Sequence, residues 1–582
     1  MAEFFQDGPQ LGNQYREDRS LQWMLRRYLT PDALADVDVD LDRFGDRVVG
    51  DIAEMARDAE TYLPRLVPYD PWGRRIDHIE TARGWQQLDR VSAEEGIVAT
   101  AYERKHGALS RIHQLAKLYL FNPSSAIYSC PLAMTDGAAR LIEVHGDEYL
   151  KSRTFPRLTS RDPSTFWTSG QWMTERTGGS DVGGTSTVAH GEGVGNTYHL
   201  HGTKWFTSAT TSQMAMTLAR IADGEGNTIE GSRGLSLFYL ETRDNDGLLN
   251  NIHLHRLKDK LGTKALPTAE LTMNGTVARL IGRPGEGVKR IVTLVNVTRV
   301  YNAICAVSGM RRAIALARDY ARRRIAFGRR LSEQPLHLET LAQLQVEFEA
   351  GLALVFHVAS LLGKDECGEA TEQESAVLRI LTPLAKLYTA KQVVSVSSEI
   401  LESFGGAGYV EDTRLPALLR DSQVLSIWEG TTNVLSLDVL RSMAKEGTLP
   451  PLLEHLSEMA SHSKSSPLEG EVAKITRAIE QIRRAAMTMG SEGPDYSQSL
   501  ARRFAYSLAR TTMATLLVEH ARWSLREGLD ARAVATARRF CEQDLAPLAT
   551  PDRRHRDTSL SLALDEELLE AELLSPSIAG QV

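Results

Sequence analysis

Five short segments combine residue types that can bind a large phosphate-bearing ligand and move a proton. They are QWMTERTGGSDVGG (171–184), KWFTS (204–208), RRRIAFGRR (322–330), FGGAGYVED (404–412) and SIWEGTTNV (426–434). Paired glycines let a backbone approach a ligand closely, and guanidinium groups bind phosphate through paired hydrogen bonds. A carboxylate such as the one in the last segment can act as a base. Together the segments predict a ligand site beside a carboxylate.

The first two segments could present a backbone, a hydroxyl and an aromatic ring to one ligand. A predicted strand enters a loop in which Gly178 and Gly179 permit close backbone approach. In KWFTS, strand alternation would place Trp205 and Thr207 on one face and Phe206 on the other. The ordinary alternatives are a plain glycine-rich hairpin loop and a buried core tryptophan.

The third and fifth segments carry charge. Arg324 lies at the end of a predicted long helix, three residues before Phe327, and its guanidinium suits a phosphate. A solvated basic helix end is the alternative, because four further arginines crowd the same stretch. Glu429 precedes Gly430, and an isolated glutamate in that setting usually faces solvent. Only the wider pattern can decide between these interpretations.

Other kinds of site are not indicated. The chain has no GxxxxGK[ST] loop, and neither GEGVGN nor GGAGYV fits a strand-to-helix GxGxxG. His253 and His255 would share one face of a strand, but no third metal ligand is indicated. The four cysteines are far apart and form no CxxC pair. We therefore expect no P-loop, no Rossmann site, no metal and no disulfide framework.

The composition is that of a large globular protein. At 582 residues the chain is too long for one core, and roughly three or four domains are expected. The formal net charge of −8 provides no global attraction to nucleic acid or to an anionic membrane. The start, MAEFFQDGPQ, lacks the pattern of a secretory signal. We expect a cytoplasmic protein without a membrane-spanning segment.

The hydrophobic patterns predict an α+β fold that is mostly α. Helical spacing dominates residues 1–165, and short strand-like runs with Gly, Asn and Asp turns fill residues 166–285. Helical spacing returns over residues 286–447, and residues 448–582 follow a GTLPP break. The expected domains are a helical domain, an antiparallel β-domain, a helical bundle and an extra helical domain.

The order and spacing of the five segments resemble the acyl-CoA dehydrogenase superfamily over residues ~20 to ~445. The resemblance implies the same helix, β-domain and helical-bundle arrangement, with FAD as cofactor and an acyl-CoA as substrate. It implies α,β-desaturation of the thioester, in which a base removes the α-proton and the β-hydrogen leaves as hydride to flavin N5. It also implies an electron-transfer flavoprotein or similar acceptor, and a homotetramer or at least a dimer.

The resemblance assigns roles to individual residues. Glu429 matches the base of the commoner branch of the family, whereas a minority branch carries its glutamate at the position of Thr298. Arg299 matches a catalytic arginine near the base and the CoA portion. The implied FAD contacts are Met173, Thr174, Gly179, Ser180, Trp205, Thr207, Ser208, Arg324, Phe327, Gly405, Gly406, Gly408, Thr431 and Asn433. The implied substrate contacts are Ser180, Trp428, Gly430 and Arg299.

Further features resemble the AidB-like branch, the alkylation-response type with an extra C-terminal helical domain. They include LGNQYREDRSLQ near the start, RLKDKLGTK, the LDVLR run and the long tail. The branch implies possible DNA binding, with Arg441 on the matching arginine. Between residues 501 and 556, 11 arginines stand against 6 acidic residues, which fits DNA binding or only oligomerisation and packing. The alternatives to a dehydrogenase are a DNA-binding flavoprotein and an acyl-CoA binding or sensing protein with low turnover.

Overall fold

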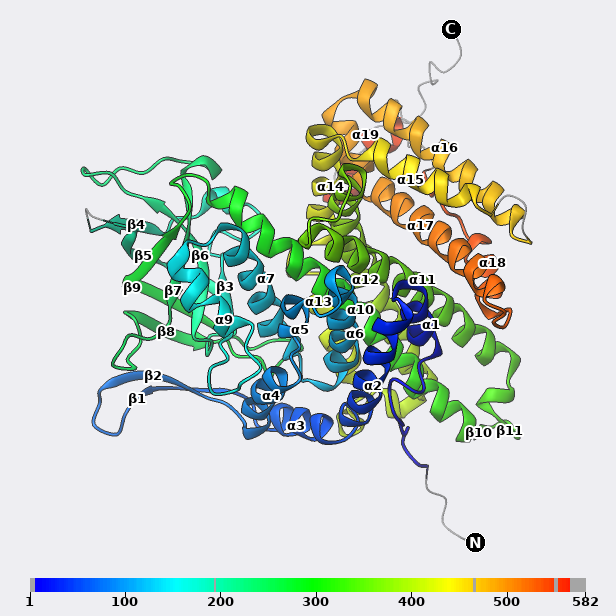
Figure 1. Ribbon diagram of the computed structural model, residues 1–582, viewed down its shortest axis with the longest axis horizontal. Helices are drawn as coiled ribbons and strands as arrows, with labels where there is room; N and C mark the ends of the chain where they lie inside the picture. The colour runs from blue at the N-terminus through cyan, green and yellow to red at the C-terminus, as the bar shows by residue number, and fades with distance from the viewer. Residues whose placement is uncertain (1–5, 193–194, 464–466, 549–552, 566–582) are drawn as a thin grey trace. The chain divides into compact units, whose positions relative to one another are not determined.

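The computed structural model of the chain describes residues 6–192, 195–463, 467–548 and 553–565 (Figure 1). The chain forms two compact units. The first holds residues 1–378 and 385–431, and the second holds residues 379–384 and 432–582. The expected α+β fold with mostly helical structure is confirmed.

The first unit begins with the predicted helices. They are α1 (Arg19–Tyr28), α2 (Pro31–Arg47), α3 (Asp51–Thr61), α4 (Arg83–Glu94), α5 (Ala99–Glu103), α6 (Ser110–Phe121), α7 (Ser129–His145), α8 (Glu148–Arg153) and α9 (Phe155–Leu158). Side-chain caps begin several of them: Asp18, Thr30 and Asp147 each accept a hydrogen bond from the first turn of α1, α2 and α8. These helices form the expected N-terminal helical domain.

A β-hairpin that we did not expect interrupts the N-terminal helices. It consists of β1 (Arg65–Tyr69) and β2 (Arg75–Glu80), paired antiparallel. Arg75 donates to the Leu254 carbonyl at 2.8 Å, and the Leu254 amide donates to Asp77 at 3.0 Å. Ile79 joins the core of the β-domain. The alternation in RIDHIE after the DPWG turn was the available sign of this hairpin.

The β-domain is one seven-stranded sheet that closes on itself. Its strands are β3 (Ser169–Trp172), β4 (Val188–Gly191), β5 (Thr197–Ser208), β6 (Met214–Ile221), β7 (Leu235–Glu241), β8 (Ile252–Leu257) and β9 (Thr268–Ile281). Hydrogen bonding runs β6-β4-β5-β9-β7 and returns to β6. Most pairs are antiparallel as expected, but β3 and β4 each run parallel to β6. The sheet is therefore mixed, because the chain crosses over in the long loop after β3 before it returns as β4.

Both faces of β6 are buried, which explains its almost unbroken apolar sequence. Met214, Met216 and Leu218 pack in a core that also contains residues of α7 and α10. Ala215 and Ala219 point to the other face, into the core enclosed by the sheet. Because side chains alternate along a strand, β6 contributes residues to two cores. The core outside the sheet, which Met214, Met216 and Leu218 share with α7 and α10, packs the sheet against the helices.

Long helices complete the first unit. They are α10 (Gly287–Arg323), α11 (Pro335–Glu366), α12 (Glu372–Ser403) and α13 (Pro416–Leu425), with the small hairpin β10 (Ile325–Ala326) and β11 (Arg329–Arg330) between the first two. By length and composition α10 and α11 could cross a membrane, but 72% and 89% of their most apolar windows are buried inside the protein. They are core helices of the predicted bundle.

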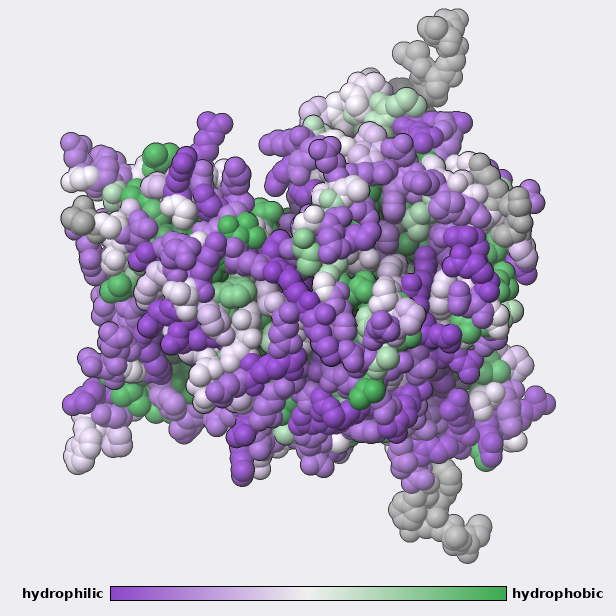
Figure 2. Space-filling model, in the orientation of Figure 1, coloured by the Kyte–Doolittle hydropathy of each residue, from purple (hydrophilic) through white to green (hydrophobic). Residues whose placement is uncertain are grey.

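The second unit holds residues 379–384 of α12 together with residues 432–582, which include the extra helical region. Its helices are α14 (Thr432–Glu446), α15 (Leu449–Ser461), α16 (Glu469–Glu492), α17 (Pro494–Arg526), α18 (Arg532–Cys541) and α19 (Arg553–Leu564). The long helix α17 packs against α14, α15, α16 and α18. Arg379 of α12 forms ion pairs with Asp438 at 3.1 Å and Glu446 at 3.0 Å. In Figure 2, the visible face is mainly hydrophilic, with apolar residues scattered among polar ones.

We expect Gly137→Ala to destabilise the first unit. A Cβ atom at Gly137 on α7 would lie 2.8 Å from Leu294 Cγ and 2.9 Å from the Leu294 carbonyl oxygen on α10. The expected loss in the free energy of unfolding is about 1–3 kcal/mol, measured by denaturant titration. Gly224→Ala is the matched control, since a Cβ there meets nothing within 4 Å. Equal stability of the two variants would contradict the close helix contact.

Candidate active site

Glu429 lies in the turn that follows α13, with its backbone in the left-handed region. The φ angles are 55° at Glu429 and 101° at Gly430. A non-glycine residue in this conformation costs about 1–3 kcal/mol and persists only where its surroundings enforce it. Such residues concentrate at functional sites. The turn directs the glutamate side chain toward α10.

Three segments far apart in the sequence surround the Glu429 carboxylate. The Thr298 hydroxyl on α10 donates to Glu429 Oε2 at 2.8 Å, and the Gln171 side chain on β3 also hydrogen-bonds it. Arg299 of α10 and Lys386 of α12 supply nearby positive charge. Thr298 marks the alternative position for the family's glutamate, and it directly contacts Glu429. A glutamate at position 298 or at position 429 would therefore place its carboxylate in the same region of the structure.

Burial raises the pKa of the Glu429 carboxyl. The Thr298 hydrogen bond, the charges of Arg299 and Lys386 and the Gln171 hydrogen bond oppose that rise in decreasing order, and the pKa stays above its ordinary value. A carboxylate with a raised pKa is a stronger proton acceptor, and a general base works best when its pKa lies near the operating pH. Its environment therefore suits Glu429 to general-base work.

Several buried polar atoms near Glu429 have no hydrogen-bond partner among the described residues. They include Gln171 Oε1, Trp428 Nε1 and both side-chain polar atoms of Asn302 on α10. Trp428 directly precedes Glu429, and Asn302 lies one helical turn beyond Thr298. Buried polar groups are nearly always paired. These atoms can thus serve as donors and acceptors for a ligand.

A buried ion pair organises the loop after β3, and the sequence reasoning missed it. Lys204 is fully buried, and its ammonium lies 2.8 Å from Glu175. Burial alone would raise the pKa of Glu175, but Lys204 and hydrogen bonds from Thr187 and Ser186 lower it to about 2. A lysine directly before Trp205, at a strand position that faces inward, was the available sign. The pair ties the loop to strand β5.

The glycine loop itself is tightly folded. Gly178 has a φ of 118°, and a Cβ atom at Gly179 would lie 2.3 Å from Thr174 Oγ1. The Thr174 carbonyl accepts a hydrogen bond from the Trp205 amide at 2.9 Å, so the loop and the KWFTS strand lie side by side. Met173 packs against the outer core of the sheet, while Ser180 is exposed.

A β-bulge corrects the expected alternation in KWFTS. Two residues of β5, Trp205 and Phe206, oppose one residue of β9. Both rings face the same cation, at 3.8 Å and 4.4 Å from the Lys258 ammonium, so they do not point to opposite faces. Thr207 is fully buried, and its hydroxyl donates to the Ala269 carbonyl. Ser208 pairs with the Thr268 hydroxyl at 3.2 Å.

A second group of predicted residues lies at the far end of α10. Arg324 caps this helix, and Phe327 is 99% exposed with a φ of 51°. The rings of Tyr320 and Phe404 lie 4.8 Å apart, which brings the end of α10 beside the loop of Gly405, Gly406 and Gly408. The structure thus joins the RRRIAFGRR and FGGAGYVED segments, apart from the Glu429 turn.

The remaining predicted residues follow Glu429 in the chain. Gly430 and Thr431 complete the turn. Asn433 and Arg441 lie on α14 and belong to the second unit, where Arg441 is exposed. Glu429, Gly430, Arg299 and Trp428 are therefore one cluster of the first unit. Gln171 and Lys386 are additions that the sequence did not single out, and Thr298 joins the cluster as a hydrogen-bond donor to Glu429.

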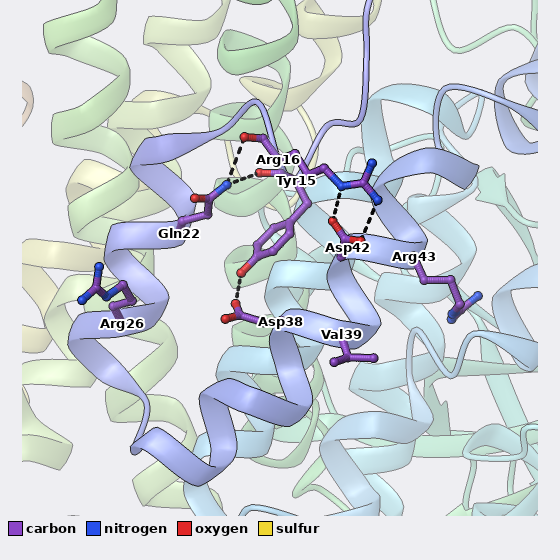
Figure 3. Close-up of a pocket in the computed structure, with 8 residues that line it drawn as sticks. All are labelled: Tyr15, Arg16, Gln22, Arg26, Asp38, Val39, Asp42 and Arg43. Carbon is purple, nitrogen blue, oxygen red and sulfur yellow. Dashed lines mark hydrogen bonds and ion pairs between the residues drawn. The ribbon is translucent and has the colours of Figure 1, made fainter.

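A separate cavity of about 610 Å³ lies between α1 and α2 (Figure 3). Its charged groups largely satisfy one another: Arg16 bonds Asp42 at 2.5 Å and 2.7 Å, and the Tyr15 hydroxyl bonds Asp38. Val39 on its wall is 74% exposed. None of the residues that line it contacts Glu429, so this cavity is no part of the candidate site.

Four family models match the chain in succession. They are "Adaptive response protein AidB N-terminal domain" over residues 9–163, "Acyl-CoA dehydrogenase, middle domain" over 170–276, "Acyl-CoA dehydrogenase, C-terminal domain" over 285–444 and "Acyl-CoA dehydrogenase 11 C-terminal domain-like" over 452–569. The last two meet near the break at residues 447–451.

Similar proteins match over nearly the whole chain. Acyl-CoA dehydrogenase family member 11 of Caenorhabditis elegans is 44% identical over 94% of this chain and 90% of the relative. Putative acyl-CoA dehydrogenase AidB of Escherichia coli is 32% identical over 75% and 79%. The crystal structure of Caenorhabditis elegans ACDH-11 in complex with C11-CoA superposes with a TM-score of 0.93 at 43% identity, covering 97% of each chain.

We expect Glu175→Gln to lower stability strongly, because it leaves the Lys204 ammonium buried without its counter-charge. The expected loss is about 3–5 kcal/mol in the free energy of unfolding at neutral pH. Folding lowers the pKa of Glu175 from 4.5 to about 2, so its contribution is present above pH 4.5 and fades as pH falls toward 2. Glu192→Gln, which alters the exposed pair with His199, is the control and should cost under about 1 kcal/mol. Similar losses in both variants would refute the organising role of the pair.

Proposed function

The chain belongs to the acyl-CoA dehydrogenase family, and we propose that it is an FAD-dependent enzyme that desaturates an acyl-CoA thioester between its α and β carbons. The observation that carries this proposal is the Glu429 carboxylate, held by Thr298 beside Arg299 and Lys386 in a strained turn. A half-buried carboxylate with nearby cations suits the removal of a weakly acidic α-proton.

The residues of the site fit a flavin. The Gly178–Gly179 loop has no room for a side chain at Gly179, and Gln171 and Trp428 each offer a buried polar atom that lacks a partner among the described residues. Thr174, Gly179, Trp205 and Ser208 would hold the ring end of FAD. When bound, FAD supplies an acceptor for the β-hydrogen as hydride.

Glu429 can take the α-proton on its carboxylate. The Thr298 hydroxyl donates to Oε2, and this hydrogen bond orients the carboxylate. The charges of Arg299 and Lys386 favour the ionised carboxylate, whereas burial raises its pKa. After proton transfer the site has lost one negative charge, so the same cations can stabilise negative charge that develops on the substrate.

The acyl-CoA substrate is supported by the relative bound to C11-CoA at 43% identity. An electron-transfer flavoprotein or similar carrier would then take the electrons from the flavin. Trp428, which lies next to the base, would help shape the acyl pocket. We propose a fatty acyl-CoA as the substrate class.

The length of α10 supports an assembly of at least two chains, and we propose a homotetramer. Arg324 lies 26 residues beyond Thr298, which is roughly 39 Å along a helix. A guanidinium so far from Glu429 suits the pyrophosphate of a cofactor that belongs to a neighbouring copy. The exposed Phe327 and the adjacent glycine loop of 405–408 suit the same interface.

DNA binding by the second unit, as in an AidB-like alkylation-response protein, is the alternative. The arginines there are largely engaged within the fold: Arg510 bonds Gln543 and the Asp544 carbonyl, Arg522 bonds Glu519, and Arg538 bonds the Pro467 carbonyl. The side chains of Arg553, Arg554 and Arg556 and the acidic run from 566 to 572 lie outside the described residues. We therefore favour a packing or assembly role for this unit. A further alternative is an acyl-CoA binding or sensing protein with low turnover. It would be favoured if acyl-CoA binds but does not reduce the flavin.

Glu429→Gln should abolish reduction of the flavin by acyl-CoA while FAD stays bound, because the amide cannot accept the α-proton. The expected loss in rate is at least about 10²–10⁴-fold, followed as anaerobic bleaching of the flavin absorbance with C11-CoA and with shorter and branched acyl-CoAs. Wild-type rates in this variant would refute the base. No bleaching of the wild-type flavin by any of them would favour the binding or DNA-associated alternatives.

Arg324→Ala should weaken retention of FAD, since it removes a phosphate-binding guanidinium. We expect the Kd for FAD to rise by at least about tenfold, which is roughly 1.4 kcal/mol of binding free energy, and the flavin-to-protein ratio after gel filtration at low flavin concentration to fall. Arg322→Ala, an exposed arginine in the same stretch, is the control and should keep its flavin. An unchanged ratio in the Arg324 variant would argue against the contact between subunits.

A further inference from the structure

We propose that Lys386 is a positioning residue for the base: its ammonium anchors the Glu429–Gly430 turn and places a positive charge next to Glu429. The inference rests on the proposed function, in which Glu429 removes the α-proton. Neither the sequence motifs nor the family matches assign a role to this residue.

The geometry is that of a buried anchor. Lys386 on α12 is 1% exposed, and its Nζ donates to the Gly430 carbonyl at 2.6 Å. Among the described residues, the two other fully buried lysines pair directly with carboxylates, Lys117 with Asp40 at 2.7 Å and Lys204 with Glu175 at 2.8 Å. Lys386 instead holds a backbone carbonyl beside a carboxylate that must stay free for chemistry.

Two anchors together define the position of the base. Thr298 holds the carboxylate, and Lys386 holds the peptide that follows Glu429. Both residues of the turn have left-handed backbone angles, which a glutamate adopts only under constraint. Without Lys386 the Gly430 carbonyl would lose this hydrogen bond, and the turn could relax toward ordinary angles. The carboxylate would then move away from its productive position.

Charge provides the second part of the role. Glu429 faces Arg299 from α10, Lys386 from α12 and the Cys130 thiol from α7. Lys386 in turn faces Glu429 and Arg299. Burial, with a smaller effect of Arg299, lowers the pKa of Lys386 to about 7 despite the opposing attraction of Glu429. Because a nearby cation favours the ionised carboxylate, loss of Lys386 should raise the pKa of Glu429 on the acid side of pH 7, where the lysine is charged.

The test compares Lys386→Met and Lys386→Arg in the full-length, FAD-loaded protein. The rate of anaerobic flavin reduction by C11-CoA with a saturated acyl chain is measured from about pH 5 to about pH 9. Flavin content serves as a check of folding. We expect the methionine variant to react at least about tenfold more slowly at neutral pH, with the acid limb of its profile shifted upward by about one to two pH units. The arginine variant keeps the charge and should keep the position of the limb. Lys391→Met on the same helix is the control and should match the wild type.

A uniform loss of rate at every pH, without a shift of the acid limb, would overturn the proposal and leave Lys386 a merely structural residue. If the methionine variant fails to fold, Lys386→Gln replaces it, because glutamine retains a donor for the Gly430 carbonyl but lacks the charge. Glu429→Gln is measured in parallel. Wild-type rates in Glu429→Gln would reject the base itself, whereas an inactive Glu429→Gln with an unshifted Lys386→Met profile would reject only the role of Lys386.

Discussion

The candidate site depends on one constraint: a carboxylate must be held inside the protein from a turn that its own backbone disfavours. Glu429 has a left-handed conformation, and contacts from β3, α10 and α12 keep its side chain in place. Each contact comes from a different part of the chain, so the arrangement around Glu429 forms only when the β-domain and the helical bundle of the first unit are both folded. The packing and hydrogen bonds of the whole unit thus offset the backbone strain at the Glu429 turn.

In the β-domain, a buried ion pair between Lys204 and Glu175 holds the loop after β3 in place. The loop after β3 is a crossover that must stay compact enough to approach a ligand, and Glu175 organises it by accepting hydrogen bonds from Ser186, Thr187 and Lys204. Because Lys204 directly precedes Trp205, the same pair sets the start of the bulge that turns two aromatic rings toward Lys258. Both halves of the site therefore rely on a buried lysine.

Helix α10 connects these features over its length. Its first turns pack on the outer face of the sheet, its middle carries Thr298 and Arg299, and its last turn leads to Arg324. A single helix therefore connects the residues around Glu429 to Arg324, for which we propose a phosphate contact to another copy of the chain. Membership of the acyl-CoA dehydrogenase family and the likeness to a relative bound to C11-CoA accord with this arrangement.

The order of helical and strand regions could be predicted from the sequence, because it follows from local periodicity and residue spacing. The five segments and the preference for Glu429 over the position of Thr298 came instead from the resemblance of these motifs to the family. Only the tertiary structure decided the β1–β2 hairpin, the parallel pairing of β3 and β4 with β6, the bulge at Trp205 and the buried partners Lys204, Thr298 and Lys386. The physical reason is that each of these results from contacts between residues far apart in the chain, where burial and charge pairing outweigh local preference.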